Sequence, residues 1–161
     1  MYYTNYNSPL GNIILTANDD GLTALSFSDA ENALNIDSRY HEKPEYFKEV
    51  TLQLSQYFTH QRETFNLPLA PKGTPFQQQV WQALQTISYG DTESYAWLAK
   101  KINNEKAVRA VGSANGKNPI ALIIPCHRVI GSNQTLTGYA GGLALKAKLL
   151  THENASFIVL K

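Results

Sequence analysis

Cysteine is almost absent from this sequence, which has a single one, Cys126, among 161 residues. One cysteine excludes an intramolecular disulfide and leaves no pair of thiolates for a zinc site. The first residues contain no basic segment followed by an apolar stretch, so we expect no secretory signal. Together these absences favour a reducing compartment. We therefore expect a cytoplasmic protein that binds no metal and no other cofactor.

Long apolar runs are missing too, because no uninterrupted stretch approaches the roughly 20 residues needed to cross a bilayer. We therefore expect no membrane partner. Hydrophobic residues make up 43% of the chain and charged residues 17%, which argues against disorder and allows one ordinary core or two small ones.

The net charge of +1 is unevenly divided along the chain. Residues 1–70 hold 4 Lys/Arg against 9 Asp/Glu, a net of −5, whereas residues 71–161 hold 10 against 4, a net of +6. The basic C-terminal half suits a polyanionic partner such as nucleic acid, although a mildly basic domain is often only soluble.

The first 70 residues have the pattern of a small α/β unit. Three β-rich runs within residues 2–28 are separated by SPLG and NDDG, whose residues suit tight turns, so we predict a hairpin pair or a three-stranded meander. The segment PEYFKEVTLQLSQYF then spaces Phe47, Val50, Leu54 and Tyr57 as on one face of a helix. This helix is expected to cover one face of the sheet.

A change of organisation occurs in NLPLAPKGTP, residues 66–75, whose prolines and glycine predict an extended linker. We place the domain boundary there, between residues 1–70 and 71–161. Thr74 is expected to cap a helix that begins at Pro75.

Two short helical patterns follow, DTESYAWLAKKI and EKAVRAVGSANG, joined by a polar turn. Asp91 or Thr92 is expected to cap the first, and the pair forms a helix-turn-helix candidate. In the second, the small residues Ala107, Ala110 and Ala114 would let the helix approach a groove closely, with Arg109 projecting beside them. Tight packing against another helix explains the small residues equally well.

The cysteine lies in IALIIPCHRVIG, residues 120–131, after an apolar run with the pattern of a buried strand. A buried cysteine is usually an inert small hydrophobe. Pro125, however, cannot donate to a strand ladder, so the chain is expected to turn where the sulfur sits. His127 and Glu153 could then supply a base and its orienting partner. Neighbouring side chains of a strand point to opposite faces, so contact between Cys126 and His127 needs a turn or a bridging water.

Taken together, IPCHRV, RAVG, NP, GYAGGL and the downstream HE resemble the O6-alkylguanine-DNA alkyltransferases, also called methylated-DNA protein-cysteine methyltransferases. The resemblance is strong from about residue 73 to residue 153. The N-terminal region matches the family only in its size and in its order of strands followed by a helix. The resemblance implies an α+β protein. A small N-terminal β-meander and helix domain, ribonuclease H-like in the family, would support a mainly helical, winged-helix-like C-terminal domain with a helix-turn-helix.

The resemblance implies direct-reversal DNA repair, in which Cys126 irreversibly takes the alkyl group of O6-alkylguanine, with O4-alkylthymine as a second candidate substrate. Because a thioether is not easily hydrolysed, the protein would act once. His127 is implied to be a base working through a water, and Glu153 to hold it. Tyr95 is implied to donate to the departing guanine. The turn that carries the cysteine would be supported by Asn118 and Pro125.

Further family positions concern the base and the duplex. Val129 and Tyr139 are implied to contact the base, with Ala140 and Gly141 beside them; Ala140 replaces a serine of some members, which predicts altered selectivity with activity retained. Arg109 is implied to enter the base stack in place of the extruded nucleotide. The helix with Ala107, Ala110 and Ala114 would lie in the minor groove with little sequence preference. We expect a monomer on double-stranded DNA.

Two other interpretations stay open at this stage. A cysteine hydrolase could use Cys126 and His127 on an ester or amide and would turn over repeatedly, but only this dyad supports it. A non-catalytic helix-turn-helix protein that binds DNA or recognises lesions would leave the cysteine a spectator. The joint presence of Cys126, His127 and Glu153 argues against that second alternative.

Overall fold

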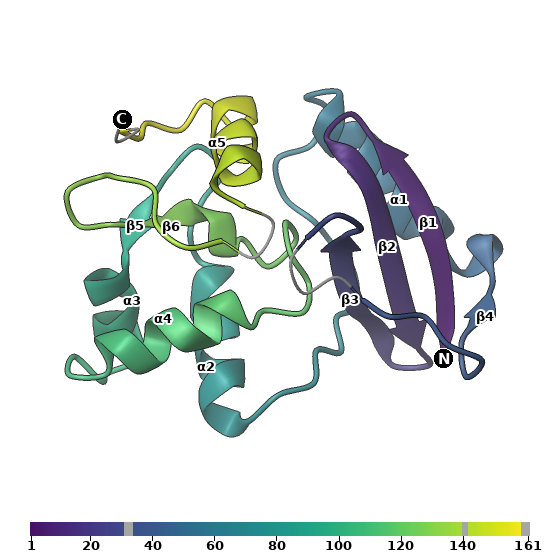
Figure 1. Cartoon of the computed structure of the whole chain (residues 1–161), viewed down its shortest axis with the longest axis horizontal. Coiled ribbons are helices and arrows are strands. Elements are labelled where there is room, and N and C mark those ends of the chain that lie inside the picture. Colours follow the sequence, from purple (N-terminus) through teal and green to yellow (C-terminus); the bar gives the residue numbers. More distant parts are fainter. Residues whose placement is uncertain (31–33, 140–141, 159–161) are drawn as a thin grey trace.

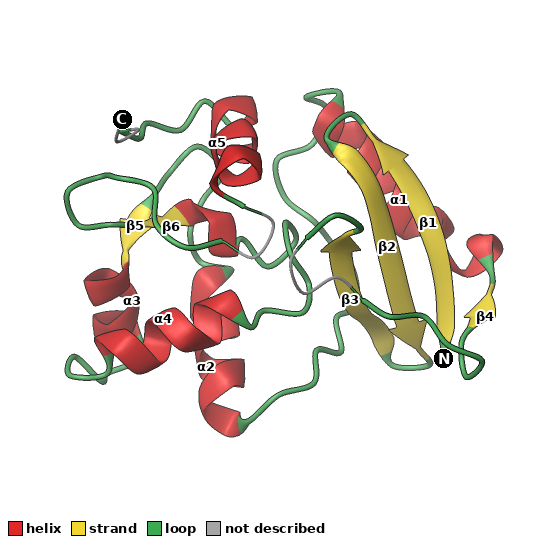
Figure 2. Cartoon of the chain, viewed as in Figure 1, coloured by secondary structure: helices red, strands yellow, loops and turns green. Residues whose placement is uncertain are grey.

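The N-terminal part of the chain is built on an antiparallel meander (Figures 1 and 2). Strands β1 (Tyr2–Ser8), β2 (Gly11–Asn18) and β3 (Gly21–Phe27) pair in sequence order, and the two-residue strand β4 (His41–Glu42) runs parallel to β1. The sheet order is β3-β2-β1-β4. The computed structural model describes residues 1–30, 34–139 and 142–158. The predicted three-stranded meander is confirmed.

One face of this sheet is covered by the 3₁₀ helix η1 (Pro44–Phe47) and by α1 (Lys48–Phe58), as Figure 1 shows. The side chains that the sequence spaced on one helical face, Phe47, Val50, Leu54 and Tyr57, are all buried. The apolar spacing therefore predicted both the helix and its inward face.

The C-terminal part is mainly helical, with two very short strands (Figure 2). It contains α2 (Pro75–Leu84), β5 (Glu93–Ser94), α3 (Tyr95–Lys101), α4 (Val108–Gly116), η2 (Cys126–Arg128), β6 (Val129–Ile130) and α5 (Leu143–His152). Helices α3 and α4 pack together as the predicted helix-turn-helix. Among helices of the described residues, none combines the length and apolarity needed to cross a membrane.

The helix starts in this part depend on local side-chain caps. Thr74 caps α2, its hydroxyl accepting from the Gln77 amide at 3.1 Å while the Gln77 side chain accepts from the Thr74 amide at 2.9 Å. Helix α3 is capped by Ser94 and not by Asp91 or Thr92, so that expectation was wrong. Because β5 pairs with β6, residues 93 and 94 are held extended and the helix begins only after them.

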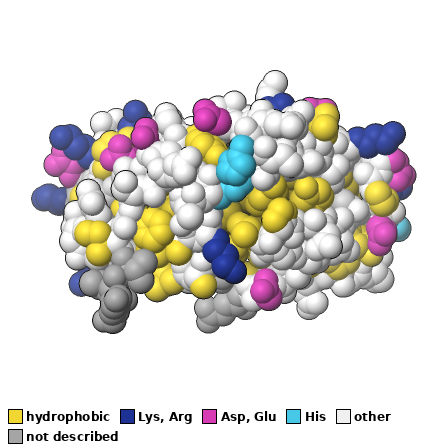
Figure 3. Space-filling view, turned by 90° about the horizontal axis from the view of Figure 1, so that it is seen from above, with side chains coloured by type: hydrophobic (Ala, Val, Ile, Leu, Met, Phe, Trp, Pro, Cys, Tyr) yellow, Lys and Arg dark blue, Asp and Glu magenta, His cyan; other side chains and the backbone are white. Residues whose placement is uncertain are grey.

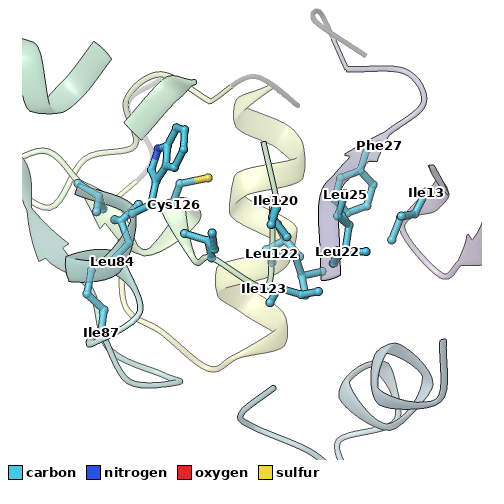
Figure 4. Close-up of a cluster of buried hydrophobic side chains, with 14 of the residues drawn as sticks. Ile13, Leu22, Leu25, Phe27, Leu84, Ile87, Ile120, Leu122, Ile123 and Cys126 are labelled. Atoms are coloured by element: carbon cyan, nitrogen blue, oxygen red, sulfur yellow. The ribbon is translucent and has the colours of Figure 1, made fainter. Parts of the chain in front are cut away.

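The two parts share one hydrophobic core, to which the edge strand β3 contributes most directly. The Leu25 amide donates to Pro119 O at 2.9 Å, and the Ala121 amide donates to Leu25 O at 3.1 Å. Figure 4 shows Ile120 and Leu122 beside the side chains of β3. The segment that leads to the cysteine is therefore anchored on the N-terminal sheet.

The predicted linker, residues 66–75, is hydrogen-bonded to β3 at its N-terminal end. The Leu22 amide donates to Pro68 O at 2.9 Å, and the Ala70 amide donates to Leu22 O at 2.8 Å. A Cβ at Gly21 would lie 2.5 Å from Pro68 O, and Gly21 has a φ of +146°, so only glycine fits this crossing.

The apolar run at residues 120–124 is not a strand, contrary to the sequence-based expectation. Apart from one bridge between Ile120 and Leu25, the segment consists of turns, with Leu122 at a φ of +71°. The Ile124 amide donates to Ile120 O at 3.0 Å, which curls the chain back on itself. Its side chains are apolar because this turn lies inside the shared core.

The surface seen from above has no uniform character (Figure 3). Lys and Arg gather mainly toward the two ends of this view, and hydrophobic side chains reach the surface between them. On this face, therefore, no single charged patch dominates.

Candidate active site

Cys126 begins η2 directly after the turn, as Pro125 led us to expect. Its side chain is 5% exposed, its amide donates to Ile124 O at 2.8 Å, and the Arg128 amide donates back to Pro125 O at 3.0 Å. The residue therefore sits on a tight bend and not within a ladder, so strand alternation no longer separates it from its neighbour. Within the described chain, no hydrogen bond joins the Cys126 sulfur to the His127 ring.

Asn118 holds this bend from inside. Its Nδ2 donates to Ile124 O at 2.7 Å, and its Oδ1 accepts from the Ile120 amide at 3.0 Å. One side chain thus satisfies backbone groups at both ends of the turn, and leaving the Ile120 amide without this acceptor would be costly. Asn118 therefore braces the turn that leads to Cys126.

Glu153, just after the last residue of α5, collects four hydrogen bonds at a fully buried carboxylate. Its Oε2 lies 2.9 Å from His127 Nε2, and it accepts from Tyr57 Oη at 2.6 Å and from Arg128 Nη2 at 3.0 Å. Its Oε1 accepts from Arg128 Nε at 2.8 Å. A third hydrogen bond of the guanidinium fixes Arg128 itself, because its Nη1 donates to Ile87 O at 2.7 Å.

The ionisation of this cluster follows from its contacts. Burial acts to raise the pKa of Glu153, but the adjacent His127 and Arg128 outweigh it and hold that pKa well below its usual value. Burial lowers the pKa of His127, so its imidazole is neutral in the resting protein. A carboxylate only accepts, so Nε2 carries the hydrogen and Nδ1 carries the lone pair. Among the described residues Nδ1 has no partner, which leaves it free to take a proton.

The thiol is itself in a low-dielectric position. Burial raises the pKa of Cys126, while the nearby Asn118 amide and the charge of Lys146 act in the opposite direction. The resting residue is therefore a thiol, and it needs a base when it reacts.

Lys146 on α5 is fully buried, which is unusual for a lysine. Its Nζ donates to Val129 O at 2.6 Å and to Thr137 O at 2.7 Å. Burial lowers its pKa to about 8, and the neighbouring Cys126 acts to raise it. The lysine ties α5 to β6 and places a positive charge near the sulfur.

A cavity of about 230 Å³ opens beside the cysteine. Cys126, Asn118 and Tyr139 line it together with residues of β3 and of the end of α4. This volume is below the roughly 300 Å³ at which pockets for drug-sized ligands begin, and it suits a small ring system. The mainly apolar wall favours a neutral ligand.

Three other predicted residues lie around this cavity or close to the sulfur. Tyr139 has a buried hydroxyl with no partner in the described part of the chain. Tyr95 is half-buried, and its hydroxyl accepts from Thr137 Oγ1 at 3.0 Å. Val129 is buried and accepts from Lys146 at its carbonyl. Ala140 and Gly141 lie outside the described residues.

The predicted small-residue face of α4 divides into two. Arg109 and Ala110 are exposed, whereas Ala107 is half-buried and Ala114 is only 3% exposed. Ala114 O accepts from Trp81 Nε1 at 2.9 Å, so this residue packs on α2. Spacings of three and four residues turn positions 107, 111 and 114 inward together. Including Ala114 in a groove-facing surface was therefore wrong.

The arrangement just described can be compared with known proteins. The model of the 6-O-methylguanine DNA methyltransferase ribonuclease-like domain matches residues 1–71, and the model of the DNA binding domain of the same enzymes matches residues 75–155. The chain belongs to the 6-O-methylguanine DNA methyltransferase family.

Relatives within this family resemble the chain over nearly its whole length. The methylated-DNA–protein-cysteine methyltransferase of Methanosarcina acetivorans is 46% identical over 155 residues, 96% of this chain and 99% of that protein. The protein of the same name from Haemophilus influenzae is 45% identical over 161 residues, 98% of this chain and 89% of its own. The crystal structure of Mycobacterium tuberculosis OGT in complex with DNA has a TM-score of 0.89 at 42% identity, covering 96% and 93% of the two chains.

Three residues of the site in this family member were not predicted from the sequence. Arg128 adjoins His127 in PCHR, and that adjacency was the available signal. Lys146 was missed because a lysine in a helix is normally solvated. Tyr57 was assigned to the core from its spacing, and nothing local indicated that its hydroxyl reaches Glu153 across 96 positions of the chain.

Within the described residues, no group of three His, Cys, Asp or Glu side chains lies close enough together to hold a metal ion.

Proposed function

We propose that this chain is a methylated-DNA–protein-cysteine methyltransferase that repairs O6-alkylguanine in double-stranded DNA, with Cys126 as the alkyl acceptor. The observation that carries the proposal is the combination of a thiol on a rigid bend beside a cavity and a neutral imidazole fixed to a buried carboxylate. Family membership supplies the reaction class, and the geometry supports the residue roles that the resemblance implies.

The proposed reaction is an in-line displacement at the alkyl carbon. His127 Nδ1 takes the thiol proton through a water, and the sulfur then attacks the carbon. The bond between that carbon and guanine O6 breaks, and its electron pair stays with the guanine. The imidazolium that forms is stabilised by the Glu153 carboxylate. The proton taken from the thiol is finally passed to the departing guanine, so the products are an S-alkylcysteine and neutral guanine, and no cofactor is consumed.

Tyr95 is proposed to assist the leaving group. Because its oxygen accepts a hydrogen bond from Thr137, its own hydrogen is available to the departing guanine. Burial raises the pKa of Tyr95, with the Thr137 hydrogen bond opposing, so the residue stays protonated and acts as a donor. Donation to the guanine reduces the negative charge that develops as the alkyl bond breaks.

Recognition of the base is proposed to use the cavity walls. The Tyr139 hydroxyl, which has no partner among the described residues, is available to an extruded base, and Asn118 with Pro125 keeps the sulfur directed at it. The role of Val129 is assigned from the resemblance alone, because its carbonyl already accepts from Lys146 and its amide donates to Cys126 O. The positions of Ala140 and Gly141 are assigned to this pocket from the resemblance alone. O4-alkylthymine is a smaller alternative for the same cavity.

Extrusion of the base is proposed to depend on the exposed side of α4. Arg109 projects from the first turn beside Ala110, where a side chain can occupy the gap left in the stack, while Ala107 lies deeper. The helix is proposed to enter the minor groove, since small residues permit close approach. The basic C-terminal half would then contact phosphates with little sequence preference.

We further propose that residues 1–70 and 71–161 act as a supporting and a reactive domain, and that the protein works as a monomer. A cytoplasmic location is supported by the single cysteine, which the reaction requires in its reduced form. Neither a hydrolase nor a non-catalytic DNA-binding protein accounts for this site as well, because the relatives described above are methyltransferases.

The test is a titration of the protein with a duplex that contains O6-methylguanine. The protein should remove one methyl group per molecule and then stop, whereas a hydrolase would continue. Cys126→Ala should bind the duplex and remove none. Continued demethylation by the alanine variant would show that another group is the acceptor.

A further inference from the structure

Tyr57 joins the N-terminal part of the molecule to the ion cluster of the C-terminal part. It lies in the last turn of α1 and is fully buried. Its hydroxyl donates to Glu153 Oε2 at 2.6 Å, the shortest of the four contacts of that carboxylate. The same oxygen lies 2.9 Å from His127 Nε2. One atom of Glu153 thus links a tyrosine of the first domain to the base of the second.

Tyr57 is held so that this contact persists. The His152 ring donates from Nε2 to Tyr57 O at 2.8 Å, because a carbonyl only accepts. His152 and Glu153, at the end of α5, therefore hydrogen-bond to the main chain and to the side chain of Tyr57, respectively. The Tyr57 ring also packs against Phe65, with ring centroids 5.5 Å apart. The hydroxyl has little freedom to choose another acceptor.

We propose that Tyr57 is a positioning residue for alkyl transfer, fixing through Glu153 Oε2 the direction in which His127 presents Nδ1. This role rests on the proposed function. A buried hydroxyl needs an acceptor, but a backbone carbonyl would serve that need equally well. Donation to the oxygen shared with His127 instead limits the rotation of the carboxylate that aligns the imidazole.

Tyr57 also sets the basicity of its partner. Burial and then the charge of Glu153 raise the pKa of Tyr57 far above its usual value, so it remains a neutral donor. A donor on Oε2 weakens the pull of that oxygen on the His127 proton. Without the hydroxyl, Glu153 would stabilise the imidazolium more strongly, and the pKa of His127 would rise. The first domain would therefore adjust the base as well as support the second domain.

Tyr57→Phe in the full chain tests this, because it removes one oxygen and keeps the ring. Single-turnover methyl transfer from an O6-methylguanine duplex is measured against pH. We expect the rate near neutral pH to fall roughly tenfold, as when an outer partner of a functional histidine is removed. The acid limb of the profile should also shift to higher pH. Affinity for the duplex should not change.

The matched control is Tyr89→Phe. The Tyr89 ring lies 6.1 Å from that of Tyr57, between centroids, but its hydroxyl donates to His152 O at 3.3 Å and not to Glu153. This variant should keep the wild-type rate and profile. Equal shifts in the two variants, or an unchanged profile for Tyr57→Phe, would overturn the positioning role.

If Tyr57→Phe is less stable than the wild type, a second measurement separates this loss of stability from the effect on His127. Nitrogen NMR of the imidazoles follows His127 in folded protein, and its pKa should rise in Tyr57→Phe but not in Tyr89→Phe. An unchanged or lowered pKa would contradict the proposal. Failure of the proposed function is recognised separately, because wild-type protein would then transfer no methyl group.

Discussion

Glu153→Gln removes the negative charge that holds His127 and Arg128 together. The Arg128 side chain is only 8% exposed, so its guanidinium cannot regain water without opening the structure. A glutamine offers only one acceptor oxygen, and its NH₂ group would face the hydrogen-bond donors that now surround the second carboxylate oxygen. Breaking a buried ion pair on one side costs about 3–5 kcal/mol. Set against a total stability of about 5–15 kcal/mol for a protein of this kind, the loss is large.

Urea unfolding near pH 7 measures this loss, provided that the slope of the transition is the same in both proteins. Glu45→Gln, at an exposed position of η1, is the control and should change the free energy of unfolding by less than about 0.5 kcal/mol. The double variant Glu153→Gln with Arg128→Met should recover part of the loss, since no unpaired charge then remains. A change below about 1 kcal/mol for Glu153→Gln would refute the idea that this cluster holds α5 to the reactive turn.

Three further outcomes are expected. Arg109→Ala should slow repair of a duplex strongly and repair of free O6-alkylguanine far less, because only the duplex requires extrusion; equal losses in a rate assay would contradict this role. Asn118→Ala should lower the free energy of unfolding by about 1–3 kcal/mol, since the Ile120 amide loses its acceptor and Ile124 O loses one of its two donors, and should slow methyl transfer. If the free energy of unfolding of Asn118→Ala equals that of the wild type near neutral pH, Asn118 does not support the turn. The free energy of unfolding should decrease as pH falls from about 7 towards 3, because the pKa values of Glu153 and His127 are both lowered in the folded state and the unfolded chain binds those protons first. Glu153→Gln should flatten this dependence in denaturant titrations, and a wild-type curve already flat in this range would disprove the assignment.

Sequence alone predicted the elements that local patterns specify. The turns between the first three strands, the apolar spacing of α1 and the cap at Thr74 all depend on neighbouring residues. The bend at Cys126 was predicted for the same reason, because Pro125 lacks an amide hydrogen whatever surrounds it. The motif around the cysteine then indicated the family, which similarity over both domains confirms.

Features set by distant contacts could not be predicted. An apolar run such as residues 120–124 has the same pattern in a buried strand and in a buried turn. Ala114 was misplaced because small residues suit both a groove and a helix contact. The hydrogen bond from Tyr57 to Glu153 forms only when two domains meet, so no local pattern contains it.

The most direct test of the account is a peptide mass map of the protein after reaction with an O6-methylguanine duplex. If Cys126 is the acceptor, the peptide that contains it gains one methyl group, in an amount equal to the guanine restored. Restored guanine with an unmodified Cys126 peptide would contradict this role.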